Sequence, residues 1–133
     1  GDWNGDGHVD AAVAVAGEES VEVLLGNGMG DLKPLARYDS GVNPHGLTSE
    51  DFNQDGELDL AVSNRTSGGI AIFLGDGSGT FQKTHSVITE HDGITLSHGD
   101  FDKDGIIDLA LVSASSHSLI FYKGDGKGNF HPW

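Results

Sequence analysis

Several residue types are scarce or missing in this chain, and each scarcity excludes a class of protein or site. There is no cysteine, which excludes disulfide bonds and thiolate-bound metals. Only seven of the 133 residues are Lys or Arg, and they form no basic cluster, which argues against nucleic acid as a partner. No apolar run approaches the roughly 20 residues that span a bilayer, so we expect no membrane insertion.

Negative charge, by contrast, is abundant and organised. The net charge is −14, and much of the acid lies in three nonapeptides, residues 2–10, 51–59 and 100–108, which begin 49 residues apart. Each has oxygen-bearing side chains at its first, third, fifth and ninth positions and glycine at its sixth. This pattern predicts a loop curled around a hard cation, and calcium fits best. Three such loops in register are not ordinary Asp/Asn/Gly turns.

The loops differ from those of EF-hands. An EF-hand loop closes with a glutamate at its twelfth position, where this chain has Val13, Val62 and Leu111. An EF-hand loop also lies between helices, whereas strand-like residues follow each nonapeptide here. We therefore expect the ninth-position aspartate to complete the ligand shell, together with the backbone oxygen of the seventh residue.

A glycine-rich segment recurs with the same period, at residues 25–30, 74–79 and 123–128. No helical periodicity follows any of the three, so they lack the helix N-terminus that a phosphate-binding loop requires. We predict hairpins with two-residue type I′ turns at Asn-Gly or Asp-Gly. The next strands then begin near Leu32, Phe81 and Phe130.

Short apolar runs between these motifs predict strands. They are rich in Val, Ile, Leu and Phe and are bounded by Gly, Asn and Ser, which favours strands over helices. The predicted strands are residues 9–15, 21–25, 46–52, 58–62, 70–74, 81–88, 94–101, 107–112 and 119–122. Four strands per period of 49 residues indicate an all-β fold of four-stranded antiparallel propeller blades.

With their acidic nonapeptide, glycine segment and four predicted strands, the repeats resemble the FG-GAP or VCBS type found in the calcium-bearing blades of integrin α-subunit propellers. The resemblance rests on residues 51–62 and 73–81 above all and spans essentially the whole chain. It implies three Ca²⁺ sites. Their side-chain ligands would be Asp2, Asn4, Asp6 and Asp10; Asp51, Asn53, Asp55 and Asp59; and Asp100, Asp102, Asp104 and Asp108, with backbone oxygens from His8, Glu57 and Ile106. The third site has one more carboxylate than the others, so we predict that it binds tightest.

Blade boundaries follow from the period. Residues 1–45 form a first blade without its inner strand, residues 46–93 a second, and residues 94–133 a third with an incomplete outer strand. Propellers close with about 4 to 8 blades. We therefore expect a propeller segment that is completed either by the rest of a larger propeller or by self-association.

In the predicted topology the loops lie alternately on the two faces of the propeller. The acidic loops and glycine turns share one face, and the other carries loops that differ between repeats, which is where a ligand site is expected. The candidate contacts are Asn43, His45, Asn64, Arg65, His91, Asp92 and His117. The histidines occupy non-equivalent repeat positions, which argues against a histidine metal centre. Trp3 takes the aromatic position of Phe52 and Phe101 and is predicted to be core.

Three functions fit this sequence to different degrees. The favoured one is a secreted or cell-surface module whose calcium is structural and which binds an extracellular protein or carbohydrate. Extracellular modules bind calcium with dissociation constants of about 10⁻⁴–10⁻³ M, which matches calcium levels outside cells. A structural domain of a larger secreted protein, without a ligand, is the alternative. A polysaccharide-lyase propeller is the remote one, because no catalytic constellation is visible and we expect no enzyme activity.

Overall fold

The structure is a computed structural model that describes residues 1–66, 68–87, 89 and 91–133. Its strands and one short 3₁₀ helix are β1 (Ala11–Val15), η1 (Ala16–Glu18), β2 (Ser20–Gly26), β3 (Leu32–Asp39), β4 (Pro44–Glu50), β5 (Asp59–Asn64), β6 (Ile70–Gly75), β7 (Phe81–Val87), β8 (Gly93–Gly99), β9 (Asp108–Ser113), β10 (Ser118–Gly124) and β11 (Phe130–Pro132). Strand thus dominates, as the apolar runs predict. Residues 67, 88 and 90, which belong to predicted loops and to one predicted strand end, lie outside the described residues.

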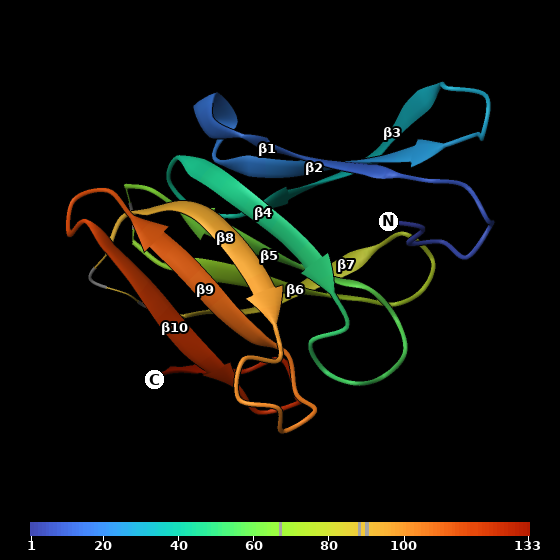
Figure 1. The fold of residues 1–133 in the computed structure, drawn as a ribbon. Helices are drawn as coiled ribbons and strands as arrows, with labels where there is room; N and C mark the ends of the chain where they lie inside the picture. Colours follow the sequence, from blue (N-terminus) through green and yellow to red (C-terminus); the bar gives the residue numbers. More distant parts are fainter. Residues whose placement is uncertain (67, 88, 90) are drawn as a thin grey trace.

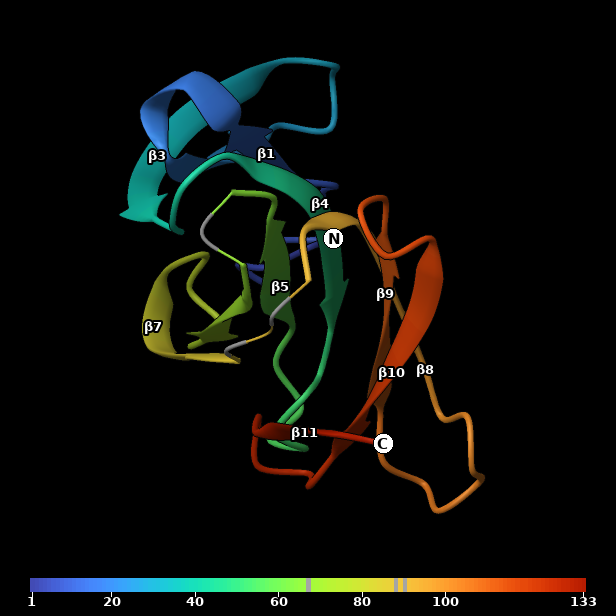
Figure 2. The ribbon, with the colours of Figure 1, turned by 90° about the vertical axis from the view of Figure 1, so that its left-hand side faces the viewer.

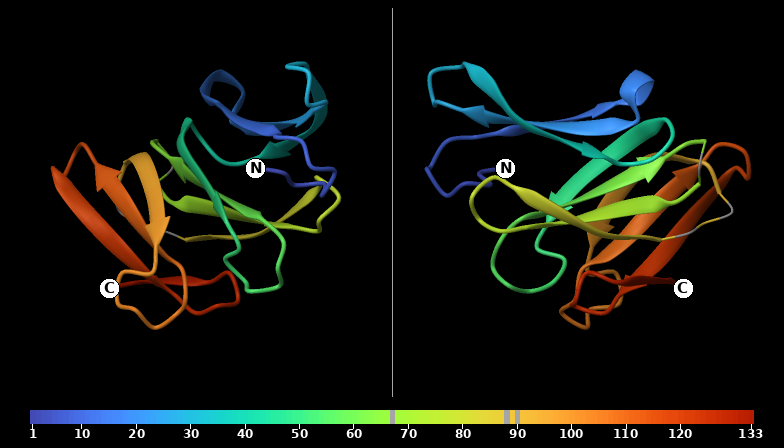
Figure 3. Two further views of the ribbon diagram at one scale, coloured as in Figure 1. Left: turned by 45° about the vertical axis from the view of Figure 1, so that its right-hand side comes forward. Right: turned by 180° about the vertical axis from the view of Figure 1, so that it is seen from behind.

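These strands form three antiparallel sheets, each a meander in chain order. The first contains β1–β3, the second β4–β7 and the third β8–β11. The sheets splay from one another as blades do (Figures 1 and 3), with β3 and β7 at the periphery (Figure 2). The inner strands β4 and β8 lie side by side, joined by Thr48 Oγ1 and His98 Nδ1 at 2.6 Å. The fold is therefore three partial propeller blades, and the ring is not closed.

The core lies between the blades. One cluster joins the first and second blades around Trp3, Val23 and Phe73, and another joins the second and third around Phe52 and Tyr122. Trp3 is buried as the sequence predicts, and the equivalent Phe52 is buried too, whereas Phe101, at the equivalent position of the third loop, is 43 % exposed. Phe101 is exposed because none of the three described blades packs against its outer side.

The hairpin turns are longer than predicted. Gly26 pairs with Leu32, Gly75 with Phe81 and Gly124 with Phe130, so each turn has five residues and not two. A type I′ turn needs positive φ at both central residues, and neither Asn27 nor its equivalents have it. The Asn27 side-chain oxygen instead accepts the N–H groups of Met29 (2.8 Å) and Asp31 (3.2 Å), which closes a wider loop.

The strand bounds also differ slightly from those predicted. The strands that follow the acidic loops begin at Ala11, Asp59 and Asp108, and the inner strands begin at Pro44 and Gly93, just before the predicted blade limits. Among the described residues, no helix has the length and apolar character needed to cross a bilayer.

Candidate metal loops

The three acidic loops have the same backbone conformation. Their fourth residues, Gly5, Gln54 and Lys103, have φ of 68°, 62° and 65°, and the sixth-position glycines have φ between 84° and 94°. Two left-handed residues in close succession bend the chain sharply enough for its side chains to point inward. The loops lie at one end of the sheets, opposite the η1 end (Figure 1).

Side-chain oxygens in each loop converge on the backbone of its second half. In the third loop, Asp100 and Asp102 both accept the N–H of Asp104 at 3.1 Å. Asp100 also accepts the N–H of Gly105 at 3.0 Å, and Asp104 accepts that of Ile106 at 2.9 Å. The first and second loops repeat these contacts at equivalent positions. The first-, third- and fifth-position oxygens are thus held together by the loop itself.

The ninth-position aspartate has an additional role. Asp108 is fully buried, and its two oxygens accept N–H groups from Phe101 (3.0 Å) and Gly124 (2.9 Å). Asp10 and Asp59 make the same pair of contacts in their blades. This residue therefore ties the acidic loop to the end of the next strand, whether or not it also binds a metal. Burial raises the pKa of Asp59 to about 6.

The third loop fits a calcium ion. Calcium takes oxygen ligands at about 2.3–2.6 Å, so two ligands of one ion lie no more than about 5 Å apart. One oxygen from each of Asp100, Asp102 and Asp108 lies within 4.8 Å of the others. In the first and second loops, Asn4 and Asn53 replace Asp102, so an amide oxygen takes the place of one carboxylate.

The family comparison agrees with the repeat seen in the structure. A family model described as FG-GAP-like repeat matches residues 2–62 and again residues 51–111. The two matches begin 49 residues apart (51 − 2) and together cover residues 2–111, most of the chain. The chain belongs to the FG-GAP-like repeat family. No curated protein and no solved structure matched it.

The second recurring element of each FG-GAP repeat, the glycine turn, packs against the acidic loop of the same repeat. Gly26, Gly75 and Gly124 leave no room for a side chain, because a Cβ there would lie 2.1–2.3 Å from the carbonyl oxygen of Val9, Leu58 or Ile107. Glycine at this position therefore lets the second strand end against the loop, where its N–H reaches the ninth-position aspartate. The two motifs form one unit at one end of each blade, as the sequence predicts.

In the third FG-GAP repeat, a lysine side chain contacts the carboxylates of the acidic loop. Lys123 contacts Asp102 and lies 2.9 Å from a carboxylate oxygen of Asp104. Its ammonium group lowers the pKa of Asp104, and the two carboxylates raise the pKa of Lys123. The equivalent positions in the other repeats are Leu25 and Leu74. Lys123 thus offsets the extra carboxylate on which the predicted order of calcium affinity rests, and sequence reasoning missed it.

The candidate ligand residues lie at the opposite end and have different surroundings. The Asn43 carbonyl accepts the N–H of Arg65 at 2.9 Å, which brings those two together. His45 Nδ1 lies 2.8 Å from the Ile94 carbonyl oxygen. Asn64 is buried and donates to the Ser40 carbonyl at 2.9 Å, so it holds the chain between two blades and does not face a ligand.

The remaining candidates lie just before the third blade, at His91 and Asp92, and within it, at His117. Asp92 accepts the hydroxyl of Ser113 (2.7 Å), the N–H of Ser115 (3.0 Å) and the Ser115 hydroxyl. These hydrogen bonds lower the pKa of Asp92 to about 2. His91 donates its N–H to Thr89, and His117 is exposed with φ of 52°. Asp92 therefore orders the loop in which His117 is displayed.

Proposed function

We propose that the chain is a calcium-binding propeller module of a secreted or cell-surface protein, in which calcium stabilises the blades and a ligand binds at the opposite end. The residues that would hold calcium are the first-, third-, fifth- and ninth-position side chains of each loop and the seventh-position carbonyl. The ion would supply positive charge that offsets the repulsion among clustered carboxylates and would link calcium binding to folding.

The observation that carries this proposal is the convergence of oxygens in the third loop, with one oxygen each from Asp100, Asp102 and Asp108 within 4.8 Å of the others. Recurrence of the same hydrogen bonds in all three loops supports extending it to the other two. A chain with 21 acidic and seven basic residues would also gain stability from bound cations.

Calcium titration tests the first half of the proposal. Isothermal calorimetry on chelator-treated protein is expected to give three binding events, with apparent dissociation constants in the range of extracellular modules, about 10⁻⁴–10⁻³ M. Asp2→Ala, Asp51→Ala and Asp100→Ala are each expected to remove one event. A protein that binds no calcium, or whose binding is unaffected by these substitutions, would refute it.

The second half concerns the end of the blades opposite to the calcium loops. Loop variation among the three repeats supports a ligand site there, formed by Asn43, His45, Arg65, His91, Asp92 and His117. An array of glycans and matrix proteins, probed with calcium and with chelator, tests it. Binding that is lost on replacing Arg65 and His117 together, with calcium binding intact, is the expected result.

A structural domain without a ligand is the second candidate. Asn64 and Asp92 favour it, because both use their side chains to hold loops in place at the end opposite to the calcium loops. It predicts normal calcium binding and an empty array. Activity on uronic polysaccharides, which we do not expect, would instead revive the propeller of a lyase.

A further inference from the structure

Both interfaces between blades use the same contact. The third glycine of one glycine turn donates its N–H to the carbonyl of the second loop residue in the preceding blade: Gly79 to Trp3 at 2.8 Å and Gly128 to Phe52 at 3.1 Å. The ring of that loop residue then meets a phenylalanine edge-on. The ring centroids are 5.9 Å apart for Trp3–Phe81 and 5.5 Å for Phe52–Phe130. The interface therefore has a loop side and a turn side with a fixed register.

The outer face of the third blade repeats the loop side. Phe101, Leu119 and Phe121 lie one period after Phe52, Ile70 and Ile72, which are buried between the second and third blades. In the third blade, Phe101 and Leu119 are exposed. With Ile120 and Trp133, these residues line an open hollow of about 500 Å³. The face thus has the composition of a blade interface.

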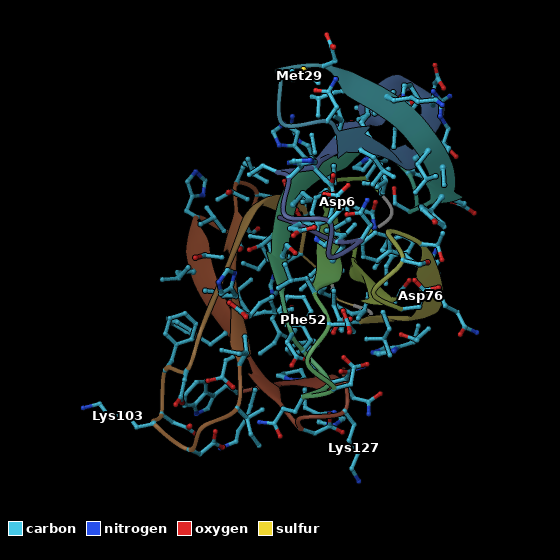
Figure 4. The ribbon with its side chains drawn as sticks, turned by 90° about the vertical axis from the view of Figure 1, so that its right-hand side faces the viewer. Asp6, Met29, Phe52, Asp76, Lys103 and Lys127 are labelled. Atoms are coloured by element: carbon cyan, nitrogen blue, oxygen red, sulfur yellow. The ribbon has the colours of Figure 1, made fainter. Side chains whose placement is uncertain are left out.

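The outer face of the first blade repeats the turn side. Leu32 lies one period before Phe81 but is 49 % exposed, compared with 8 % for Phe81. Val13, equivalent to the buried Val62, is also exposed. Gly30 occupies the position of Gly79 and Gly128, in a turn that reaches outward at the tip marked by Met29 (Figure 4).

We propose that these two faces bind each other between two copies of the chain, head to tail, with Gly30 N–H donating to the Phe101 carbonyl. Two copies of the three described blades supply six blades, within the range of closed propellers of about 4 to 8 blades. A head-to-tail contact between identical chains closes into a ring when the rotation permits. The contact does not depend on which ligand the module takes.

Charge at the rim supports a second copy as the occupant. At the first internal interface, Leu25 and Leu35 are the side chains nearest to Gly79, at 3.1 and 3.3 Å from a Cβ built there. Their equivalents in the third blade, both two periods on, are Lys123 and Trp133. The Trp133 ring centroid lies 6.0 Å from the Lys123 ammonium. The register therefore places Lys123 beside Gly30 of the second copy.

The residue after Gly30 has a charge opposite to that of Lys123. It is Asp31, whereas the equivalent residues after Gly79 and Gly128 are the uncharged Thr80 and Asn129. The only carboxylate among these three turn positions thus meets the only lysine among the three facing positions. Such charge complementarity fixes register and partner more than it raises affinity.

One feature weakens the contact. Glu22 occupies the position of Ala71, which is fully buried at the first internal interface. Glu22 pairs with Arg37 at 3.2 Å, and burying that pair costs free energy that an apolar residue would not. The copies should therefore associate reversibly, and Glu22→Ala should tighten the dimer, on the order of tenfold for each 1.4 kcal/mol recovered.

Sedimentation equilibrium of the whole chain in millimolar calcium tests the proposal. A concentration-dependent dimer is expected, and Phe101→Asp should make it monomeric without unfolding it, because Phe101 is exposed. Lys123→Glu and Asp31→Lys should each weaken the dimer, and the double variant should restore it. Lys127→Glu is the matched control, since it makes the same charge change on an exposed side chain (labelled in Figure 4) that does not line the hollow.

Two results would overturn the proposal. One is a protein that stays monomeric at all concentrations, for wild type and for Glu22→Ala. The other is a dimer that Phe101→Asp leaves intact or that the charge-swap pair does not restore. Circular dichroism of each variant checks that its fold is unchanged.

Discussion

Replacing Asp108 with alanine separates two roles of the ninth-position aspartate. If Asp108 only binds calcium, its loss leaves the calcium-free protein unchanged, or stabilises it by removing a negative charge from the loop. If Asp108 also ties the loop to β10, its loss destabilises the protein even without calcium. The structure favours the second outcome, because both carboxylate oxygens already accept backbone N–H groups.

The size of the effect follows from those two contacts. An unsatisfied buried donor costs about 1–3 kcal/mol. The Gly124 N–H is buried, whereas the Phe101 N–H is partly buried and can recover part of the loss from water. We therefore expect Asp108→Ala to lower the unfolding free energy by about 2–5 kcal/mol, a large fraction of the 5–15 kcal/mol typical of a domain.

Urea unfolding in chelator and in millimolar calcium provides the assay. Asp104→Ala is the matched control, because it removes a carboxylate from the same loop but takes an acceptor only from solvent-accessible groups, the exposed Ile106 N–H and the Lys123 ammonium, which keeps Asp102. Both variants should lose calcium affinity, and only Asp108→Ala should lose stability in chelator. If Asp108→Ala does not fold, Asp108→Asn keeps one acceptor and gives an intermediate loss. Unfolding free energies in chelator that match wild type would refute the tie.

Three further predictions concern single residues. Lys123→Leu, which restores the leucine of the other repeats, should raise calcium affinity in the third loop a few-fold, as measured by calorimetry; unchanged affinity would show that the ammonium does not compete. Lys103→Gly should leave the unfolding free energy unchanged or raise it by up to about 1 kcal/mol, because φ of 65° favours glycine; a clear loss of stability in urea would contradict this. Asp92→Asn should reduce stability near neutral pH. Because hydrogen bonds depress the pKa of Asp92 to about 2, its support is present above about pH 4, is lost as the pH falls towards 2, and the variant should then approach wild type in acid unfolding.

The fold could be predicted because the 49-residue period repeats two independent motifs. Alternating apolar runs between them give the strands, and their spacing gives four strands per blade. The turn length could not be predicted, because Asn-Gly also suits a two-residue hairpin. The wider turn is closed by the Asn27 side-chain oxygen, which accepts the N–H groups of Met29 and Asp31. The sequence also does not reveal that Gly26 approaches the carbonyl of Val9, 17 residues earlier.

The acidic loops of the candidate site could be predicted from their repeated pattern, but the contacts between these loops and other strands could not. A ninth-position aspartate is what a calcium loop requires, so the pattern does not disclose that Asp108 also accepts Phe101 and Gly124 N–H groups. Lys123 and Trp133 were missed because their roles depend on a neighbouring element. A signal was present nonetheless: subtracting two periods places Trp133 on Leu35 and Lys123 on Leu25, the two residues that meet Gly79.

Lys123 lies both beside the third calcium loop and on the face that meets a second copy. In the structure the Lys123 ammonium forms ion pairs with Asp102 and Asp104, two of the residues that would hold calcium in the third loop. These carboxylates cannot serve both cations fully, so calcium binding should free Lys123 to meet Asp31 of a second copy. Calcium should therefore tighten the wild-type dimer.

Sedimentation equilibrium of the Lys123→Leu variant, with calcium and with chelator, measures this coupling. Leucine restores the apolar contact of the internal interfaces, so the variant should still dimerise, but with a much smaller dependence on calcium. If calcium tightens Lys123→Leu as strongly as wild type, the coupling runs through the order of the loop and not through Lys123. If calcium loosens the wild-type dimer, the carboxylates and Asp31 do not compete for the same ammonium group.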